Sequence, residues 1–177
     1  IKSINQYFNK QTTGRVWSKY LDRLSAYRTN YIRDCFHKMS RILLEWCQEH
    51  EIGTLVLGSN TFWKQDSHMG KQNNQSFVSI PFDMLKSMIE LKACEYGITV
   101  TKTEESYTSK ASFLDNDEIP VYKAGDHQKY SFSGKRIKRG LYRSAEGILI
   151  NADLNGAANI LRKAGFDTSG IRLSGLL

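Results

Sequence analysis

Two short apolar runs, each preceded by a helical pattern, constrain the fold of this chain most strongly. Apolar residues recur every three or four positions from about Trp17 to His50, which predicts one long amphipathic helix. The run 53–58 is rich in β-branched and apolar residues and is bounded by glycines, so it predicts a buried strand. A second helix from Pro81 to Gly97 precedes a second strand over 98–105. This alternation indicates an α/β layered domain.

The C-terminal part of the chain continues the pattern with a hairpin and a helix. Residues 135–151 predict a hairpin with strands over 138–142 and 148–151, joined by a turn at 144–147. Asp153 opens a final helix that runs to about Ala164 and is ended by Gly165. Residues 111–135, which separate the second strand from the hairpin, have no regular periodicity and are expected to form an insertion.

Charge and cysteine content narrow the class of protein. The formal net charge is +7, which favours a polyanionic partner such as nucleic acid, although an ordinary basic protein is the simpler alternative. Cys35, Cys47 and Cys94 lie on the apolar faces of predicted helices, and none forms a CxxC pair. We therefore expect buried thiols in a reducing, cytoplasmic compartment, without disulfides. No apolar run approaches the length of a membrane span, so no membrane partner is expected.

Carboxylates gather where predicted strands end. Glu104 and Glu105 close the second strand, and Asp153 stands where the last strand gives way to the final helix. Such carboxylates suit Mg²⁺, and two such ions, roughly 3.5–4 Å apart, clamp a phosphodiester in many nucleases. The alternative for Asp153 is a helix N-cap, and the alternative for either glutamate is a solvated charge.

A basic run from Lys129 to Arg143 predicts contact with nucleic acid. No acidic residue interrupts it, and Tyr130, Phe132 and Tyr142 are interleaved, a mixture that suits phosphates and stacked bases. The alternative is a solvated hairpin face. Lys64, in the polar segment 59–76, is a further candidate contact. The basic residues of the run are Lys129, Lys135, Arg136, Lys138, Arg139 and Arg143.

Four segments together resemble the C-terminal part of the TnpB family, which comprises transposon-encoded, RNA-guided DNA endonucleases related to type V CRISPR effectors. The resemblance covers nearly the whole chain, and its two most specific segments are Tyr-Thr-Ser-Lys at 107–110 and Asp-Leu-Asn-Gly-Ala-Ala-Asn-Ile at 153–160. The other two are residues 1–10 and the Trp-Lys-Gln sequence at 63–65.

The resemblance implies a RuvC-like nuclease domain of RNase H-like fold, with 1–177 as its C-terminal part. Asp153 matches the third-motif aspartate of such domains. The middle-motif glutamate would end the first strand, but Gly58 stands there, so we expect the carboxylate from Glu105 or its neighbour Glu104. Successive side chains on a strand point to opposite faces, so one of the two reaches the metal, and we favour Glu105.

Two further departures from the family pattern shape the expectations. Many relatives carry a four-cysteine zinc ribbon, whereas this chain has no cysteine after Cys94, and His127 alone cannot replace the ligands. We expect a zinc-free insertion over 111–135 in its place. The family's first catalytic aspartate would lie before Ile1, so an N-terminal segment or a second chain is expected to complete the active site.

The expected activity is Mg²⁺-dependent hydrolysis of DNA directed by a guide RNA. Base pairing would select the target, while the protein would hold the heteroduplex through its backbone. Two alternatives stay open. The chain could come from a nuclease-inactive regulator that binds nucleic acid, or from a RuvC-like nuclease that uses no guide.

Overall fold

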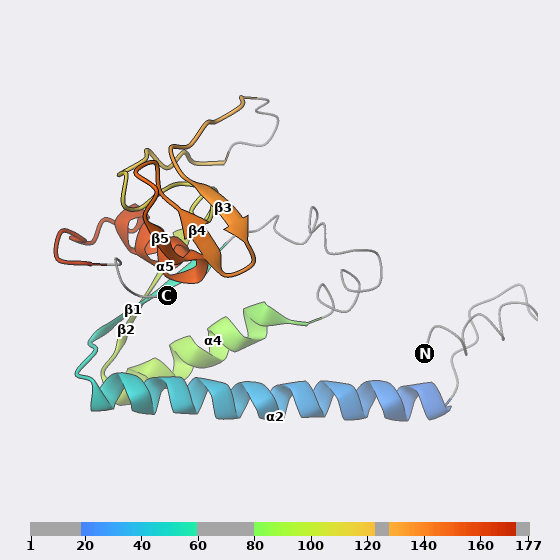
Figure 1. The fold of residues 1–177 in the computed structure, drawn as a ribbon. Coiled ribbons are helices and arrows are strands. Elements are labelled where there is room, and N and C mark those ends of the chain that lie inside the picture. Colours follow the sequence, from blue (N-terminus) through green and yellow to red (C-terminus); the bar gives the residue numbers. More distant parts are fainter. Residues whose placement is uncertain (1–18, 60–79, 123–127, 173–177) are drawn as a thin grey trace, which may run out of the picture. The chain divides into compact units, whose positions relative to one another are not determined.

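The computed structural model describes residues 19–59, 80–122 and 128–172, and the chain divides into two compact units. One unit comprises Ile1–Glu51 and Gln75–Tyr96, and the other comprises Ile52–Asn74 and Gly97–Leu177. Helices make up the described part of the first unit, whereas strands and one helix make up that of the second (Figure 1). The segments matching 1–10 and 63–65 lie outside the described residues, as does Lys64.

The first unit consists of helix α2 (Lys19–Glu49), helix α4 (Phe82–Ala93) and the short 3-10 helix η1 (Cys94–Tyr96). Both long helices confirm the helical patterns, and α2 packs against α4. Lys92 of α4 fixes this pairing, because its Nζ donates hydrogen bonds to His37 O at 2.8 Å and to Ser40 Oγ at 2.9 Å.

The buried face of α2 contains only part of the apolar pattern that predicts this helix. Phe36, Ser40, Leu44 and Cys47 follow a line along the helix and are buried. Other apolar residues of the same periodic pattern, Tyr31, Met39, Ile42 and Trp46, are exposed. Apolar residues occupy two stripes of α2, so periodicity alone does not select the stripe that packs against α4.

The prediction that all three cysteines are buried is only partly correct. Cys47 is buried and Cys35 is half-buried, but Cys94 is exposed because it lies in η1 after the end of α4. All three thiols are free. Burial raises the pKa of the Cys47 thiol, so that thiol stays protonated near neutral pH.

Strands β1 (Thr54–Ser59) and β2 (Thr99–Glu104) form a parallel pair in the second unit and confirm the two predicted strands. Thr54 is opposite Thr99 and Ser59 is opposite Glu104. The ladder continues by one bond, since the Glu105 backbone N–H donates to Ser59 O at 3.3 Å. The carboxyl ends of both strands therefore meet at one edge, where Glu105 emerges.

A small antiparallel sheet follows the insertion and corrects the predicted hairpin. It contains β3 (Lys135–Lys138), β4 (Leu141–Arg143) and β5 (Leu149–Asn151) in sequence order. The predicted strand 138–142 is wrong, because the chain reverses at Gly140, where φ is +78°. Within residues 111–122 and 128–134 the structure contains neither helix nor strand.

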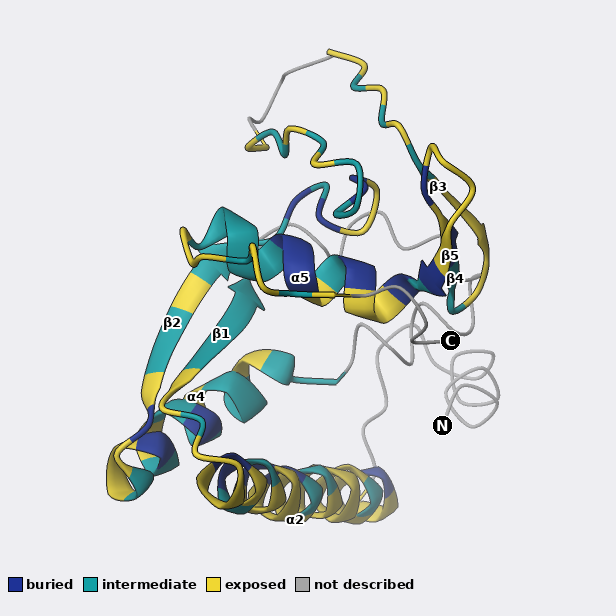
Figure 2. Cartoon of the chain, turned by 60° about the vertical axis from the view of Figure 1, so that its left-hand side comes forward, coloured by how far each residue is buried: buried dark blue, intermediate teal, exposed yellow. Residues whose placement is uncertain are grey.

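Helix α5 (Ala152–Lys163) packs against both sheets of the second unit and ends before Gly165, as predicted. Buried positions recur along it (Figure 2). The buried core that α5 shares with the small sheet contains Tyr142 and Ile150 of the sheet and Ala152 and Ala158 of the helix. Burial raises the pKa of Tyr142 to about 12, so its phenol stays neutral and donates to Lys110 O at 2.8 Å.

Candidate functional site: a carboxylate-lined hollow

An open hollow of about 460 Å³ lies in the second unit between the end of β2, strand β3 and the first turns of α5. It brings together Glu105, Asp153 and Arg136 from three separate elements. Two of the three predicted catalytic carboxylates therefore border one space. The remaining lining residues are Ser106, Tyr107, Thr108, Ser109, Ala152, Gly156, Ala157 and Ile160.

Glu105 fills space that a side chain at position 58 would otherwise take. A Cβ added to Gly58 would collide with the Glu105 carboxylate and would lie 3.1 Å from Ile160 Cδ1. A glycine lets a backbone and a neighbouring group approach closely. Gly58 on β1 thus leaves the space that the Glu105 carboxylate after β2 occupies. From the sequence, only the absence of a carboxylate at position 58 was evident.

The Glu104 carboxylate is occupied by contacts within the protein and does not line the hollow. Its carboxylate pairs with Lys163, whose side chain is 9% exposed, and accepts the Ser106 backbone N–H at 2.6 Å. Burial alone would raise the pKa of Glu104, but the hydrogen bonds from Lys163 and Ser106 outweigh it and lower the pKa below its ordinary value. The contacts of Glu104 therefore stabilise the fold, whereas Glu105 borders the hollow.

Asp153 is not the N-cap of α5. Asn151 caps the helix, because its side-chain oxygen accepts the backbone N–H groups of Asp153 at 2.8 Å and Leu154 at 3.3 Å. The Asp153 side chain is 86% exposed, and its Oδ1 lies 3.6 Å from a guanidinium nitrogen of Arg136. The capping alternative for Asp153 is wrong, and the carboxylate is accessible to a ligand.

Two asparagines of the segment 153–160 hold the backbone beside the hollow. Asn159 Nδ2 donates to Thr108 O at 2.9 Å and Ala111 O at 2.7 Å. Asn155 Nδ2 donates to Ala111 O at 2.9 Å, and its Oδ1 accepts the Phe113 N–H at 3.0 Å. Both side chains are fully buried, so the Asp-Leu-Asn-Gly-Ala-Ala-Asn-Ile segment fastens the Tyr-Thr-Ser-Lys segment to α5.

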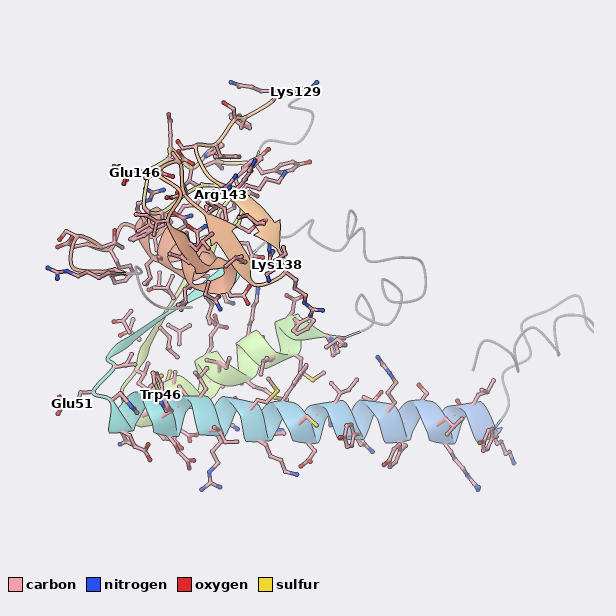
Figure 3. All side chains as sticks on the ribbon, viewed as in Figure 1. Trp46, Glu51, Lys129, Lys138, Arg143 and Glu146 are labelled. Atoms are coloured by element: carbon pink, nitrogen blue, oxygen red, sulfur yellow. The ribbon has the colours of Figure 1, made fainter. Side chains whose placement is uncertain are left out.

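The predicted basic run divides between two faces of the small sheet. Arg136 is opposite the buried Tyr142 and shares its face, which explains its place at the hollow. Lys135 is opposite Arg143, and Lys138 is opposite Leu141, so these cations lie on the other face. Figure 3 shows Lys129 well apart from Lys138 and Arg143. Arg139 lies in the turn between β3 and β4.

Acidic side chains close the insertion on itself. Asp117 accepts the backbone N–H of Ser112 at 2.7 Å and that of Ser133 at 3.1 Å, joining the two ends of the insertion. Asp115 accepts the Ala145 N–H at 2.8 Å.

Among the described residues, no group of three or more His, Cys, Asp or Glu side chains is arranged to hold a metal ion. No helix in the described ranges has the length and apolarity needed to cross a bilayer.

Comparisons with known proteins agree with this architecture. The family model for the Cas12f1-like TNB domain matches residues 82–160, a stretch that includes the carboxylates and Arg136. TnpB-like protein ORF457 of Acidianus two-tailed virus is 32% identical over 139 residues, which cover 75% of this chain and 27% of that protein. The cryo-EM structure of the Cas12f1-sgRNA-target DNA complex matches with a TM-score of 0.56 at 18% identity, over 80% of this chain and 36% of that chain.

The fold is thus a mixed α/β fold shared with the corresponding part of Cas12f1, and its open hollow is bordered by two carboxylates and an arginine. The chain is a TnpB/Cas12f-like protein that contains the TNB domain, which confirms the resemblance to the TnpB family. It spans about a quarter of the length of the curated relative that it matches.

Proposed function

We propose that this chain carries part of the active site of a Mg²⁺-dependent DNA endonuclease with a RuvC-like domain of RNase H-like fold. The supporting observation is that Glu105 and Asp153 border one hollow while the adjacent Glu104 is paired elsewhere. In this proposal residues 1–177 are the C-terminal part of that domain, and the segment 111–135 replaces a zinc ribbon.

The two carboxylates suit the ion. Mg²⁺ is commonly bound by one or two carboxylates together with water and substrate phosphate, and both side chains here supply oxygen ligands at an open position. When bound, Mg²⁺ would supply Lewis-acid stabilisation and a water of lowered pKa, and two such ions are expected. A third carboxylate would come from residues outside those described or from a second chain.

Arg136 has a defined part in this proposal. It stands 3.6 Å from Asp153 and borders the hollow, so its guanidinium offers a cation to a phosphate that enters between the carboxylates. Lys135, Lys138 and Arg143 lie on the opposite sheet face, where they suit a more distant stretch of nucleic-acid backbone. DNA and a guide RNA are the proposed partners, by analogy with the sgRNA and target DNA of the Cas12f1 complex.

Replacing either carboxylate tests the proposal. Asp153→Asn or Glu105→Gln, introduced into the intact nuclease with its RNA, should slow Mg²⁺-dependent DNA cleavage by about 100-fold or more, because metal ions contribute several kcal/mol to such reactions. DNA binding should largely persist in both variants. Rates are measured on a labelled target strand over a Mg²⁺ titration.

Glu146→Gln is the matched control, because Glu146 is an exposed carboxylate in the turn before β5 and does not line the hollow. It should cleave at the wild-type rate. Wild-type cleavage by Asp153→Asn would refute the metal role. A wild-type protein that binds nucleic acid but never cleaves it, with or without RNA, would favour the regulator instead.

A further inference from the structure

Tyr107 has a backbone conformation that tyrosine rarely adopts. Its φ is +64°, in the left-handed region, which β-carbon crowding makes unfavourable for residues other than glycine. Neighbouring bonds impose this conformation, since Tyr107 O accepts the backbone N–H groups of Lys110 and Ala111, both at 2.9 Å. A glycine or asparagine would meet the backbone requirement at lower cost, so the aromatic ring itself needs an explanation.

The Tyr107 ring belongs to an aromatic cluster at the rim of the hollow. Tyr130 meets it edge to face, with ring centroids 5.1 Å apart, and Phe132 lies 6.2 Å away. Lys110 Nζ lies 5.8 Å from the centre of the same ring. Tyr107 is half-buried and lines the hollow, so part of its surface is open to a ligand.

The distribution of charge around Tyr107 indicates the kind of ligand. The hollow that Tyr107 lines offers Arg136 and two carboxylates, and Lys110 adds a cation near the ring. A nucleotide meets all of these groups at once, because its base can stack on an aromatic ring while its phosphate lies near the arginine. A base can stack in this way only when it is unpaired or splayed from its partner.

We propose that Tyr107, supported by Tyr130 and Phe132, is a base-stacking residue that positions the nucleotide next to the scissile phosphate. This inference rests on the proposed function for the location of the phosphate. Tyr107 acts as a positioning residue: it touches the base and aligns the strand across Glu105 and Asp153, and it takes no part in the chemistry. It also makes the site selective for a single strand.

The test measures binding apart from cleavage. All proteins carry Asp153→Asn and are assayed in EDTA, with fluorescence anisotropy of a labelled oligothymidylate as the readout. Tyr107→Asn should weaken binding about 5- to 150-fold, the range for loss of one stacked base, because asparagine tolerates the left-handed backbone but lacks the ring. Tyr107→Phe keeps the ring and should bind within about twofold of the parent protein.

An abasic oligonucleotide distinguishes stacking from a structural role. An abasic residue, moved along the strand in successive oligonucleotides, should weaken binding to the parent protein at one position and have little effect there on Tyr107→Asn. A duplex of the same sequence should bind both proteins equally. Equal losses for single strand, abasic strand and duplex would overturn the inference, as would unchanged binding by Tyr107→Asn.

The two proposals can fail separately in these experiments. If the wild-type protein never cleaves DNA but the abasic result holds, the stacking role stands and the nuclease proposal fails. If the wild-type protein cleaves in a manner that requires Asp153 but Tyr107→Asn binds single strands normally, the nuclease proposal stands and the stacking role fails.

Discussion

Helix α5 has one face that borders the hollow and another that holds the chain between residues 104 and 117. On the holding face, Asn155 and Asn159 are fully buried, and Lys163 is nearly so. On the hollow face, Asp153 is 86% exposed, and Gly156 has no heavy atom within 4 Å of the place where a Cβ would stand. Polar groups therefore serve stability on one face and are left available for a ligand on the other.

The same two sides separate the consecutive glutamates at the end of β2, where Glu104 is the last residue of the strand and Glu105 follows it. Glu104 turns to Lys163 on the holding side, while Glu105 turns to the hollow beside Gly58. Strand alternation explains the opposite directions. The comparison teaches that neighbouring carboxylates of identical chemistry acquire different roles from what surrounds them, and substitutions on the two sides should therefore have different effects.

The largest effect on stability is expected at Asn159. Asn159→Ala removes both hydrogen bonds from Nδ2 and leaves Thr108 O and Ala111 O without that donor in a buried place. Ala111 O keeps the donor Asn155 Nδ2, so the free energy of unfolding should fall by about 2–4 kcal/mol from the loss at Thr108 O and a small cavity together. Chemical denaturation followed by circular dichroism measures the change.

Ala157→Ser is the matched control for Asn159→Ala, because Ala157 is exposed on the hollow face of the same helix. Its effect on the free energy of unfolding should stay within about 0.5 kcal/mol. If Asn159→Ala were as stable as this control, the holding role of the buried amide would be wrong.

The second effect compares the adjacent glutamates. Glu104→Gln removes the charge opposite Lys163, which is 9% exposed, and should lower the free energy of unfolding by about 1–2 kcal/mol, since solvent screens part of the pair. Glu105→Gln should change it by less than about 0.5 kcal/mol. Thermal unfolding of both variants at neutral pH measures the difference, and equal losses would contradict the division between the two sides.

The stability that Glu104 contributes should also depend on pH in a defined direction. Hydrogen bonds from Lys163 and Ser106 hold the folded pKa of Glu104 below its ordinary value of 4.5. The stability from Glu104 is therefore complete above that pH and is lost as the pH falls through the folded pKa. The gap in melting temperature between wild type and Glu104→Gln should narrow on acidification, and a gap that widens in acid would contradict the assigned shift.

Sequence alone predicted the elements of the fold well because their signals are local. Periodicity located α2, the bounding glycines located β1, and Gly165 marked the end of α5. The reversal at Gly140 was missed because a single glycine between Arg139 and Leu141 does not by itself mark a turn within a strand-like run. Which stripe of α2 packs against α4 depends on tertiary contacts, which periodicity does not contain.

The site was only partly predictable for the same reason. The sequence named Glu105, Asp153 and Arg136 but gave no sign that Arg136 alone among the β3 and β4 cations shares the face of Tyr142. That separation follows from strand register, which the misplaced hairpin obscured. The fit of Gly58 against Glu105 likewise became visible only once β1 and β2 were paired in parallel.

The smallest expected change in stability is a gain, and it comes from a substitution on the hollow face of α5. Gly156→Ala replaces a helical glycine at a place with no neighbouring heavy atom within 4 Å, so the free energy of unfolding should rise by about 0.5–1 kcal/mol. A rise of about 2–4 °C in melting temperature is expected from 1 kcal/mol in a chain of this size. A loss of stability would show that this face is packed like the other and would remove the basis of the comparison.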